Sequence, residues 1–391
     1  MKVGVKLGEI ATIYSGGTPS RGEPSYWGGD IPWVKTTQIQ NGVITEQDIE
    51  EWITDEGLRR SAAKMVPKGS VLMAMIGQGK TRGQVAILNI DATTNQNAAA
   101  ILALDGNDPG YIYQQLLFRY KQIRNISNSS GQQNLNLDLI RSITFPKIDN
   151  AQQPLIANLL TAWDTAIVKT EQLISAKEKQ FDWLKSTLLL RNPNAKHWKT
   201  YPLGQFIEEK KEKSTFPDLY PCLTSSRRGM FLQNEYFSRQ VASKDNTGYK
   251  IMDRGDFTFR SMSDDGIFVF NQQNIVDKGL ISPAYGVFAS KCNMDPDYLY
   301  YFLNSSSFRR SLAREVQGGT RTALKLNALK KLDVDVPELQ EQKAIANKLN
   351  VAKQEINLLV ELAEQYRKQK RGLMQKLLTG EWRVNTDKEV A

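Results

Sequence analysis

The sequence has few of the residues that most catalytic and metal sites require. Its 391 residues include one histidine, His197, and two cysteines, Cys222 and Cys292. The histidine lies in an Asn- and Pro-rich connector, so Ser–His or Cys–His catalysis would have to recruit that single residue, and a zinc site lacks ligands. Two separated cysteines outside any metal-like cluster are typical of reduced thiols. We therefore expect a cytoplasmic protein.

Long apolar runs are also missing. No stretch reaches the roughly 18 consecutive apolar residues of a membrane span, and the first residues lack the apolar run of a secretion signal. Hydrophobic residues make up 40% of the chain and charged residues 24%, which is ordinary for a globular protein with a core. The net charge of +9 favours a polyanionic partner such as nucleic acid, although the same surplus also serves solubility.

Two long stretches carry apolar residues at alternating spacings of four and three, one beginning at Ile156 and the other at Ile345. This spacing predicts two amphipathic helices that pair as a coiled coil. Residues 152–189 and 341–378 align without gaps at an offset of 189 and share twelve identities in 38 positions, including a matched Ile-Ala-Asn. Leucine heptads alone do not readily produce that match, so it indicates an internal repeat.

The segments that precede the two helices resemble each other more weakly. Leu7-Gly8 matches Leu203-Gly204, and Asp108-Pro109-Gly110-Tyr111 matches Asp295-Pro296-Asp297-Tyr298. A polar loop with glycine and a short strand ending in proline then come before each helix. Short β-rich runs between Gly, Asn and Pro residues indicate mixed domains with irregular sheets.

We therefore predict an α+β fold, in which two mixed α/β domains are separated by two long antiparallel helices with pseudo-two-fold symmetry. The predicted boundaries are 1–148 for the first domain, 149–191 for the first helix, 192–336 for the second domain, and 337–391 for the second helix and tail. We expect the first helix to start at Asn150, with Gln153 completing a capping box.

One segment resembles a phosphate-binding loop, Ala74 to Thr81 with Lys80 before the threonine. Ala74 stands where that motif requires glycine. The next residues, from Arg82 to Val85, predict a turn into a strand rather than the helix whose N-terminus would hold the phosphate. A basic turn that contacts DNA is the better interpretation.

Other enzyme classes find little support. Asp297, Glu341 and Lys343 have the residue types of a metal-dependent nuclease, but the last two fall at the start of the second helix, where a solvated face is the ordinary explanation. A DNA methyltransferase would need a Pro-Pro-aromatic motif, and the sequence contains no Pro-Pro pair. We expect no catalytic residue, no metal site and no cofactor bound by this chain. A stand-alone nuclease or ATPase and a coiled-coil scaffold that binds only proteins remain the alternatives.

Polar turns fit the recognition of DNA bases better. Arginine binds guanine through two hydrogen bonds, and Asn or Gln binds adenine in the same way, although any surface loop is rich in such residues. In the first domain the candidate DNA-binding residues are Thr18, Lys35, Thr36, Thr37, Gln38, Lys80, Thr81, Arg82, Asn95, Gln96, Gln132, Gln133 and Asn134. In the second domain they are Ser225, Ser226, Arg227, Arg228, Arg260, Ser261, Ser263, Tyr285, Thr320 and Arg321. The basic members can also contact phosphate, which positions a protein without specifying sequence.

Several short motifs together resemble the specificity subunit of type I restriction-modification enzymes. They are Leu7-Gly8-Glu9-Ile10, Ser15-Gly16-Gly17-Thr18-Pro19-Ser20, Tyr26-Trp27-Gly28-Gly29-Asp30-Ile31-Pro32-Trp33, Gly131-Gln132-Gln133-Asn134-Leu135, Gly279-Leu280-Ile281-Ser282-Pro283-Ala284-Tyr285, Gly319-Thr320-Arg321 and Leu377-Leu378-Thr379-Gly380-Glu381-Trp382-Arg383. The resemblance covers nearly the whole chain, and the doubled order of domain and helix is its most specific part.

The resemblance implies a division of labour between this chain and its partners. In that family each globular domain reads one half of an asymmetric, interrupted sequence in double-stranded DNA. The helices set the gap between the half-sites and dock two methyltransferase subunits. Those subunits bind S-adenosylmethionine and methylate an adenine flipped from each half-site. Restriction subunits that use ATP and Mg can join. The resemblance thus implies a non-catalytic chain that supplies the DNA address.

Overall fold

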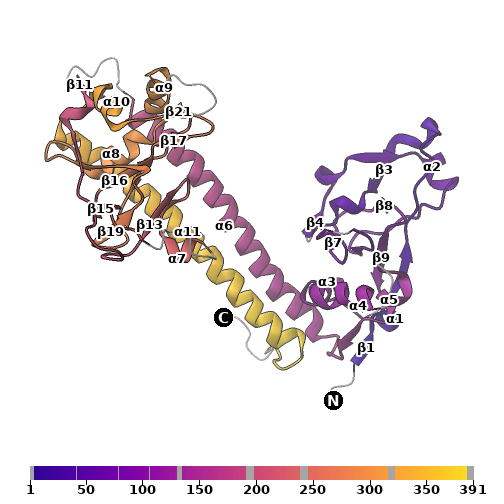
Figure 1. Cartoon of the computed structure of the whole chain (residues 1–391). Helices are drawn as coiled ribbons and strands as arrows, with labels where there is room; N and C mark the ends of the chain where they lie inside the picture. Colours follow the sequence, from indigo (N-terminus) through magenta and orange to yellow (C-terminus); the bar gives the residue numbers. More distant parts are fainter. Residues whose placement is uncertain are drawn as a thin grey trace, which may run out of the picture. The chain divides into compact units, whose positions relative to one another are not determined.

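The structure is a computed structural model (Figure 1), and it describes residues 4–40, 42–77, 79–104, 106–129, 134–190, 198–237, 245–315 and 322–384. The chain divides into two compact units. Unit 1 comprises Met1–Glu171 and Glu361–Ala391, and unit 2 comprises Gln172–Val360. Two long helices, α6 (Gln152–Leu188) and α11 (Leu339–Leu378), each contribute residues to both units. No helix in the part of the chain described here is long and apolar enough to cross a membrane.

Unit 1 begins with a mixed α/β domain. Its strands are β1 (Gly4–Lys6), β2 (Ala11–Ser15), β3 (Trp27–Val34), β4 (Gly42–Ile44), β5 (Glu51–Ile53), β6 (Val71–Ala74), β7 (Val85–Leu88), β8 (Thr93–Thr94), β9 (Ala98–Ala103) and β10 (Thr144–Pro146). Its α-helices before α6 are α1 (Leu7–Ile10), α2 (Asp55–Arg59), α3 (Pro109–Phe118), α4 (Tyr120–Ser129) and α5 (Leu137–Arg141). Short 3-10 helices cover η1 (Pro24–Tyr26), η2 (Thr36–Gln38) and η3 (Glu46–Asp48).

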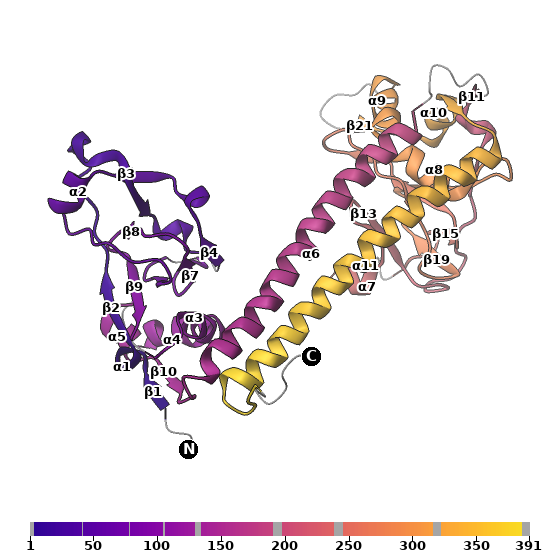
Figure 2. The ribbon, with the colours of Figure 1, turned by 180° about the vertical axis from the view of Figure 1, so that it is seen from behind.

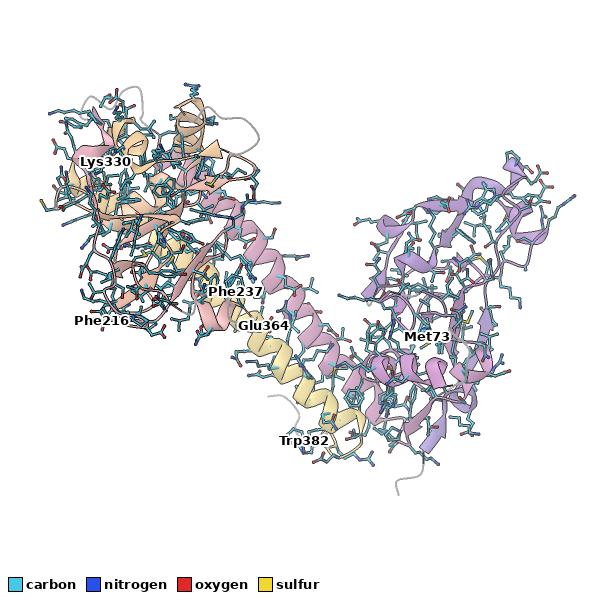
Figure 3. The ribbon with its side chains drawn as sticks, viewed as in Figure 1. Met73, Phe216, Phe237, Lys330, Glu364 and Trp382 are labelled. Atoms are coloured by element: carbon cyan, nitrogen blue, oxygen red, sulfur yellow. The ribbon has the colours of Figure 1, made fainter. Side chains whose placement is uncertain are left out.

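The main sheet of unit 1 has the order β2-β9-β6-β7-β4, beside a three-stranded sheet β5-β3-β8 and the pair β1-β10. The four residues of β6 are all buried, which explains why that strand is a continuous apolar run rather than an alternating one. Met73 of β6, which is labelled in Figure 3, belongs to the buried cluster that includes Ile112 and Leu116 of α3 on one side of the sheet. Leu72, its neighbour, packs with Val34 on the other side.

Like unit 1, unit 2 opens with a strand, a short helix and a strand, and ends with a short strand before its long helix, but its sheets differ. Its strands are β11 (Lys199–Pro202), β12 (Ile207–Glu209), β13 (Leu223–Ser226), β14 (Gly229–Leu232), β15 (Lys250–Asp253), β16 (Phe257–Arg260), β17 (Met262–Ser263), β18 (Asn271–Gln272), β19 (Lys278–Ile281), β20 (Tyr285–Ser290), β21 (Thr322–Ala323) and β22 (Asp333–Val336). Its helices before α11 are η4 (Leu203–Gln205), α7 (Gln233–Tyr236), α8 (Pro296–Leu303), α9 (Ser306–Glu315) and α10 (Leu326–Lys331).

The core of unit 2 is aromatic. Its largest sheet has the order β12-β20-β16-β18. The rings of Phe257 and Phe288, on neighbouring strands of that sheet, stack with centroids 5.4 Å apart, and Phe270 packs at 5.3 Å from Phe259. This cluster continues into the first turns of α11 through Leu349, so the helix shares the core of the domain.

The two long helices pair in antiparallel fashion within each unit, as the heptad spacing predicts (Figure 1). In unit 1, Lys370 of α11 forms an ion pair with Asp164 of α6 at 2.5 Å. In unit 2, Lys177 of α6 forms one with Glu355 of α11 at 2.7 Å. Figure 2 shows α3 beside the first turns of α6, where Gln114 donates to Asp164 at 3.0 Å. The predicted coiled-coil pairing is therefore confirmed.

The predicted start of the first helix is wrong by two residues. Helix α6 begins at Gln152 rather than at Asn150. The side-chain carbonyl of Gln153 does not cap Asn150, because it accepts instead from the backbone N–H of Asp108 at 2.9 Å. A tertiary contact thus replaces the local capping box.

The frame of the two domains repeats down to single hydrogen bonds. The backbone N–H of Leu7 donates to Ile143 at 2.8 Å, and that of Leu203 donates to Leu332 at 2.8 Å. The glycine that follows each leucine is required by close packing. A Cβ at Gly8 would lie 3.0 Å from the Cβ of Arg141. A Cβ at Gly204 would likewise lie 3.2 Å from the Cβ of Lys330, so the matched Leu-Gly pairs reflect one structural element built twice.

Candidate nucleic-acid interface

Four of the predicted polar residues of unit 1 meet through side-chain hydrogen bonds. The hydroxyl of Thr18 donates to Gln96 at 2.5 Å, and the hydroxyl of Thr36 donates to Asn95 at 2.8 Å. They come from three places: the segment after β2, the start of η2, and the turn between β8 and β9. The neighbouring Thr37 is exposed. Thr36 itself is only 8% exposed, so its hydroxyl holds Asn95 in place rather than facing DNA. Gln96 is exposed, and Thr18 and Asn95 are half-buried. We call these four residues the unit 1 polar cluster.

The same region connects to the turn between β6 and β7. The backbone N–H of Met75 donates to Asn97 at 2.9 Å, and its carbonyl accepts from Leu135 at 2.9 Å. The turn, the Asn95–Asn97 segment and the described end of the polar loop at Asn134 therefore converge beyond the carboxyl end of β6. Sequence spacing alone does not bring these three loops together.

The Lys80 turn has the predicted conformation. Strand β7 follows at Val85 rather than a helix, so the described residues of this segment do not supply the helix N-terminus that a phosphate-binding loop requires. Lys80 is exposed and its carbonyl accepts from the hydroxyl of Tyr120 at 2.5 Å. Arg82, by contrast, is only 7% exposed. Its side chain does not lie on the surface that a DNA contact requires, so we leave Arg82 out of the candidate interface.

Lys35 and Gln38 make contacts within the chain. Lys35 forms ion pairs with Glu50 at 3.0 Å and Glu51 at 3.4 Å. The side-chain carbonyl of Gln38 accepts from the backbone N–H of Lys35 at 2.6 Å, and its amide donates to the carbonyl of Asp48. These contacts fix the segment around η2. They also engage the Lys35 amine and the Gln38 amide, which were predicted to bind DNA.

Sequence reasoning missed Arg21, which lies beside this loop. Its two terminal nitrogens each donate to Glu51 at 2.9 Å, and its guanidinium lies 3.7 Å from the ring centroid of Trp27. Hydrogen bonding from Arg21 holds the pKa of the Glu51 carboxyl below its usual range. In the sequence, only the position of Arg21 between the Gly-Gly-Thr-Pro stretch and Trp27 could have indicated it, because its partner Glu51 is 30 residues away.

In unit 2 the predicted residues gather around the β13–β14 hairpin. A hollow of about 160 Å³ lies beside its tip. Its lining includes Ser225, Ser226, Arg227, Arg260 and Ser263. The structure thus brings together five predicted residues from the hairpin, the end of β16 and β17. The hydroxyl of Tyr285, a sixth, donates to the carbonyl of Ser225 at 3.3 Å. Ser261 borders a different hollow, beside Ala323.

Three unpredicted residues support this hairpin. The amide of Asn271 donates to the Ser225 hydroxyl at 2.8 Å and to the Ser226 carbonyl at 2.7 Å. Asp265 forms an ion pair with Arg227 at 2.5 Å. The guanidinium of Arg228 lies 5.2 Å from the ring centroid of Tyr236, and hydrogen bonding with Arg228 lowers the pKa of that tyrosine. The two consecutive arginines therefore have different partners.

The remaining candidates are placed as follows. Gln132, Gln133, Thr320 and Arg321 lie outside the described residues. Asp297 accepts from the amide of Asn350 at 2.7 Å, and Glu341 accepts from the indole N–H of Trp198 at 3.2 Å. Both carboxylates thus take part in contacts between the domain and α11. Over the ranges given above, no group of three or more His, Cys, Asp or Glu side chains is placed to hold a metal ion.

Known proteins share both the sequence pattern and the fold. Residues 2–177 and 195–365 match the family described as type I restriction modification DNA specificity domain. The chain is 27% identical over 194 residues to the EcoR124I/EcoR124II specificity subunit of Escherichia coli, covering 46% of each protein. It is 30% identical over 189 residues to the MjaIX specificity subunit of Methanocaldococcus jannaschii, covering 47% of this chain and 41% of that protein. The matched part thus spans less than half the length of these two relatives.

The fold extends further than these alignments. A crystal structure of a type I restriction-modification S subunit from M. genitalium superimposes with a TM-score of 0.57 at 12% identity, covering 96% of both chains. At that identity the likeness concerns the fold alone. It includes both domains and both long helices, so the doubled architecture is shared.

Proposed function

The chain belongs to the type I restriction-modification DNA specificity family, and we propose that it recognises a two-part sequence in double-stranded DNA, one half-site with each unit. The observation that carries this proposal is a repeated frame with different polar surfaces. Gln153 and Gln342 make the same contact in the two repeats, whereas the unit 1 polar cluster and the β13–β14 hairpin share no sequence pattern. Duplicated frames that differ in surface chemistry suit two different half-sites.

The chemistry of both surfaces suits base edges. In the unit 1 polar cluster the exposed side chain of Gln96 presents an amide, which can pair with the major-groove edge of adenine. The unit 2 hollow is bordered by Arg227 and Arg260, and guanidinium groups pair with guanine. Exposed lysines such as Lys80 add phosphate contacts, which raise affinity without specifying sequence.

We further propose that two methyltransferase subunits dock on the long helices and carry out all the chemistry, with S-adenosylmethionine bound by them. Apolar side chains remain exposed on both helices. Leu173 is 44% exposed, and its repeat equivalent Leu362 is 39% exposed. Val351 and Leu358 of α11 are 59% and 57% exposed. Leu173 and Leu362 are thus apolar groups exposed to water at equivalent places of the repeat, which suits two copies of one partner, whereas the counterparts of Val351 and Leu358 are Ala162 and Lys169. Restriction subunits that use ATP and Mg would join the same assembly.

Selection from randomised duplex DNA tests the recognition proposal. The full-length chain would be tagged in its native host and purified with the subunits that accompany it. We expect enrichment of one bipartite, non-palindromic motif with a fixed gap, and binding that weakens steeply with added salt. Enrichment of no sequence, or of an uninterrupted palindrome, would contradict the proposal. A chain that captures proteins but no DNA would instead be a scaffold.

A further inference from the structure

The tip of the β13–β14 hairpin carries two arginines in different surroundings. Arg228 lies against the rings of Tyr236 and Phe231, at 5.2 and 5.9 Å from their centroids. Arg227 instead pairs with Asp265, and its side chain is 64% exposed. It borders the hollow described above. Of the two arginines at the hairpin tip, only Arg227 borders this hollow.

The carboxylate of Asp265, which pairs with Arg227, is fixed by two further hydrogen bonds. One oxygen of Asp265 accepts from the hydroxyl of Ser263 at 3.0 Å and from the backbone N–H of Ile267 at 3.2 Å. The other oxygen accepts from a terminal nitrogen of Arg227 at 2.5 Å. Hydrogen bonding from Arg227 lowers the pKa of Asp265 to about 2, so the carboxylate stays charged at neutral pH.

The ion pair with Asp265 orients the guanidinium of Arg227 for a ligand with two neighbouring hydrogen-bond acceptors. A guanidinium has five N–H donors in a rigid plane, and the contact with Asp265 uses one terminal nitrogen. The rest of the donor edge can pair with O6 and N7 of guanine. Fixing the side chain in advance also reduces the rotamer entropy lost on binding. The negative charge of Asp265 disfavours a phosphate at the same place, because the two anions would repel each other.

We propose that Arg227 is a specificity-determining residue of unit 2 that reads a guanine in one half-site, and that Asp265 is the positioning residue that orients it. The inference rests on the proposed function and sharpens it, since it assigns one base to one side chain. Ser225, Ser226 and Ser263 border the same hollow and supply further hydrogen-bonding groups beside that base.

The chain offers a matched control in the same unit. Arg254 pairs with Asp277 at 3.1 Å, but Arg254 also donates to the carbonyl of Asn274 at 2.6 Å. Asp277 is 95% exposed, so it is not held in the way that Asp265 is. This pair does not border the hollow. It therefore has the same residue types without the same setting.

The test is selection from randomised duplex DNA with the tagged full-length chain and its accompanying subunits. The variants are Arg227→Ala, Arg227→Lys, Asp265→Asn, Asp265→Glu and the control Arg254→Ala. We expect Arg227→Ala to lose the preference for one G·C pair by roughly 10- to 100-fold and to leave the other positions unchanged. Arg227→Lys should keep part of the affinity but not the full preference, since lysine lacks the bidentate fork.

The positioning role of Asp265 is tested by the preference for the same G·C pair in the Asp265 variants. Asp265→Asn should weaken the preference at the same G·C pair, Asp265→Glu should restore part of it, and Arg254→Ala should leave the motif unchanged. Melting temperatures separate these effects from misfolding. An unchanged motif with Arg227→Ala, or an equal loss for all sequences, would overturn this inference while the wild-type motif still supports the proposed function. A wild-type chain that selects no motif would defeat the proposed function itself.

Discussion

The side-chain carbonyl of Gln342 accepts a hydrogen bond from the backbone N–H of Asp295 at 2.9 Å. This contact ties the first turn of α11 to the residue that caps α8. The amide of Gln342 also donates to the carbonyl of Pro337 at 3.0 Å, and the side chain is buried. Gln153 makes the corresponding contact with Asp108 in unit 1. Each domain is thus joined to its long helix by the same glutamine.

Replacing Gln342 with leucine should destabilise unit 2. The substitution leaves the N–H of Asp295 and the carbonyl of Pro337 without this partner in a buried setting, which costs about 1–3 kcal/mol. Urea unfolding followed by tryptophan fluorescence measures the change. Gln369→Leu on the exposed surface of α11 is the control, and it should change stability by less than about 0.5 kcal/mol. Equal effects of the two substitutions would contradict the role given to Gln342.

Asp256 should make the stability of unit 2 depend on pH. Burial raises its pKa to about 6 from the usual 3.8. Because the folded state holds the proton more tightly than the unfolded state, the free energy of unfolding falls as pH rises from about 4 to about 6. Between these two pH values the free energy of unfolding should fall by at most about 3 kcal/mol.

Asp256→Asn removes the charge while its side-chain carbonyl can still accept from the backbone N–H of Asp253, now bonded at 2.8 Å. The variant should match the wild type near pH 4 and exceed it in stability at pH 7.5. Unfolding curves at the two pH values measure this. The exposed Asp277→Asn variant serves as the control. A stability gain that is the same at both pH values would show that the carboxyl does not titrate in this window.

Exchange of residues 1–148 for the corresponding domain of another family member should change one half-site only. The boundary falls between the end of β10 at Pro146 and the start of α6 at Gln152, so no element is cut. Mapping of methyladenine by single-molecule sequencing of a host that carries the chimera measures the outcome. Changes in both half-sites would mean that the two units do not read DNA independently.

Removal of one heptad from each helix should shorten the gap between the half-sites. Deletion of residues 169–175 and 358–364 keeps the ion pairs of Asp164 with Lys370 and of Lys177 with Glu355, because both lie outside the deleted segments. Seven helical residues correspond to roughly 10 Å, or about three base pairs. Methyladenine mapping of the deletion strain measures the gap. An unchanged gap would show that the helices do not set it.

The sequence predicts the parts of this protein that depend on local periodicity. Ile156 and Leu160 are buried, as are Ile345 and Leu349, because each helix has to bury the stripe that its own spacing creates. The internal repeat can be detected in the sequence for the same reason, because the buried positions of the two helices match at a constant offset of 189 residues. The predicted start at Asn150 failed where a tertiary contact of Gln153 overrides the local cap.

The sequence predicts which loops carry the polar surfaces, but it does not predict which side chains in those loops contact each other. Thr18 and Gln96 are 78 residues apart, and Arg227 and Asp265 are 38 apart, so no local pattern links them. Arginine is usually a surface residue, yet Arg82 is buried. Helix α4 packs beside it, and Arg124 of that helix donates a hydrogen bond to the Arg82 carbonyl. Which candidates face DNA is therefore decided by packing rather than by residue type.

We propose that this chain selects the DNA sequence that a methylating complex modifies. The most direct test maps methyladenine across the genome of the native host by single-molecule sequencing, with the gene intact and with it deleted. We expect a two-part, non-palindromic motif with a fixed gap, methylated in the intact strain and unmethylated in the deletion strain. A methylation pattern that is the same in both strains would contradict it.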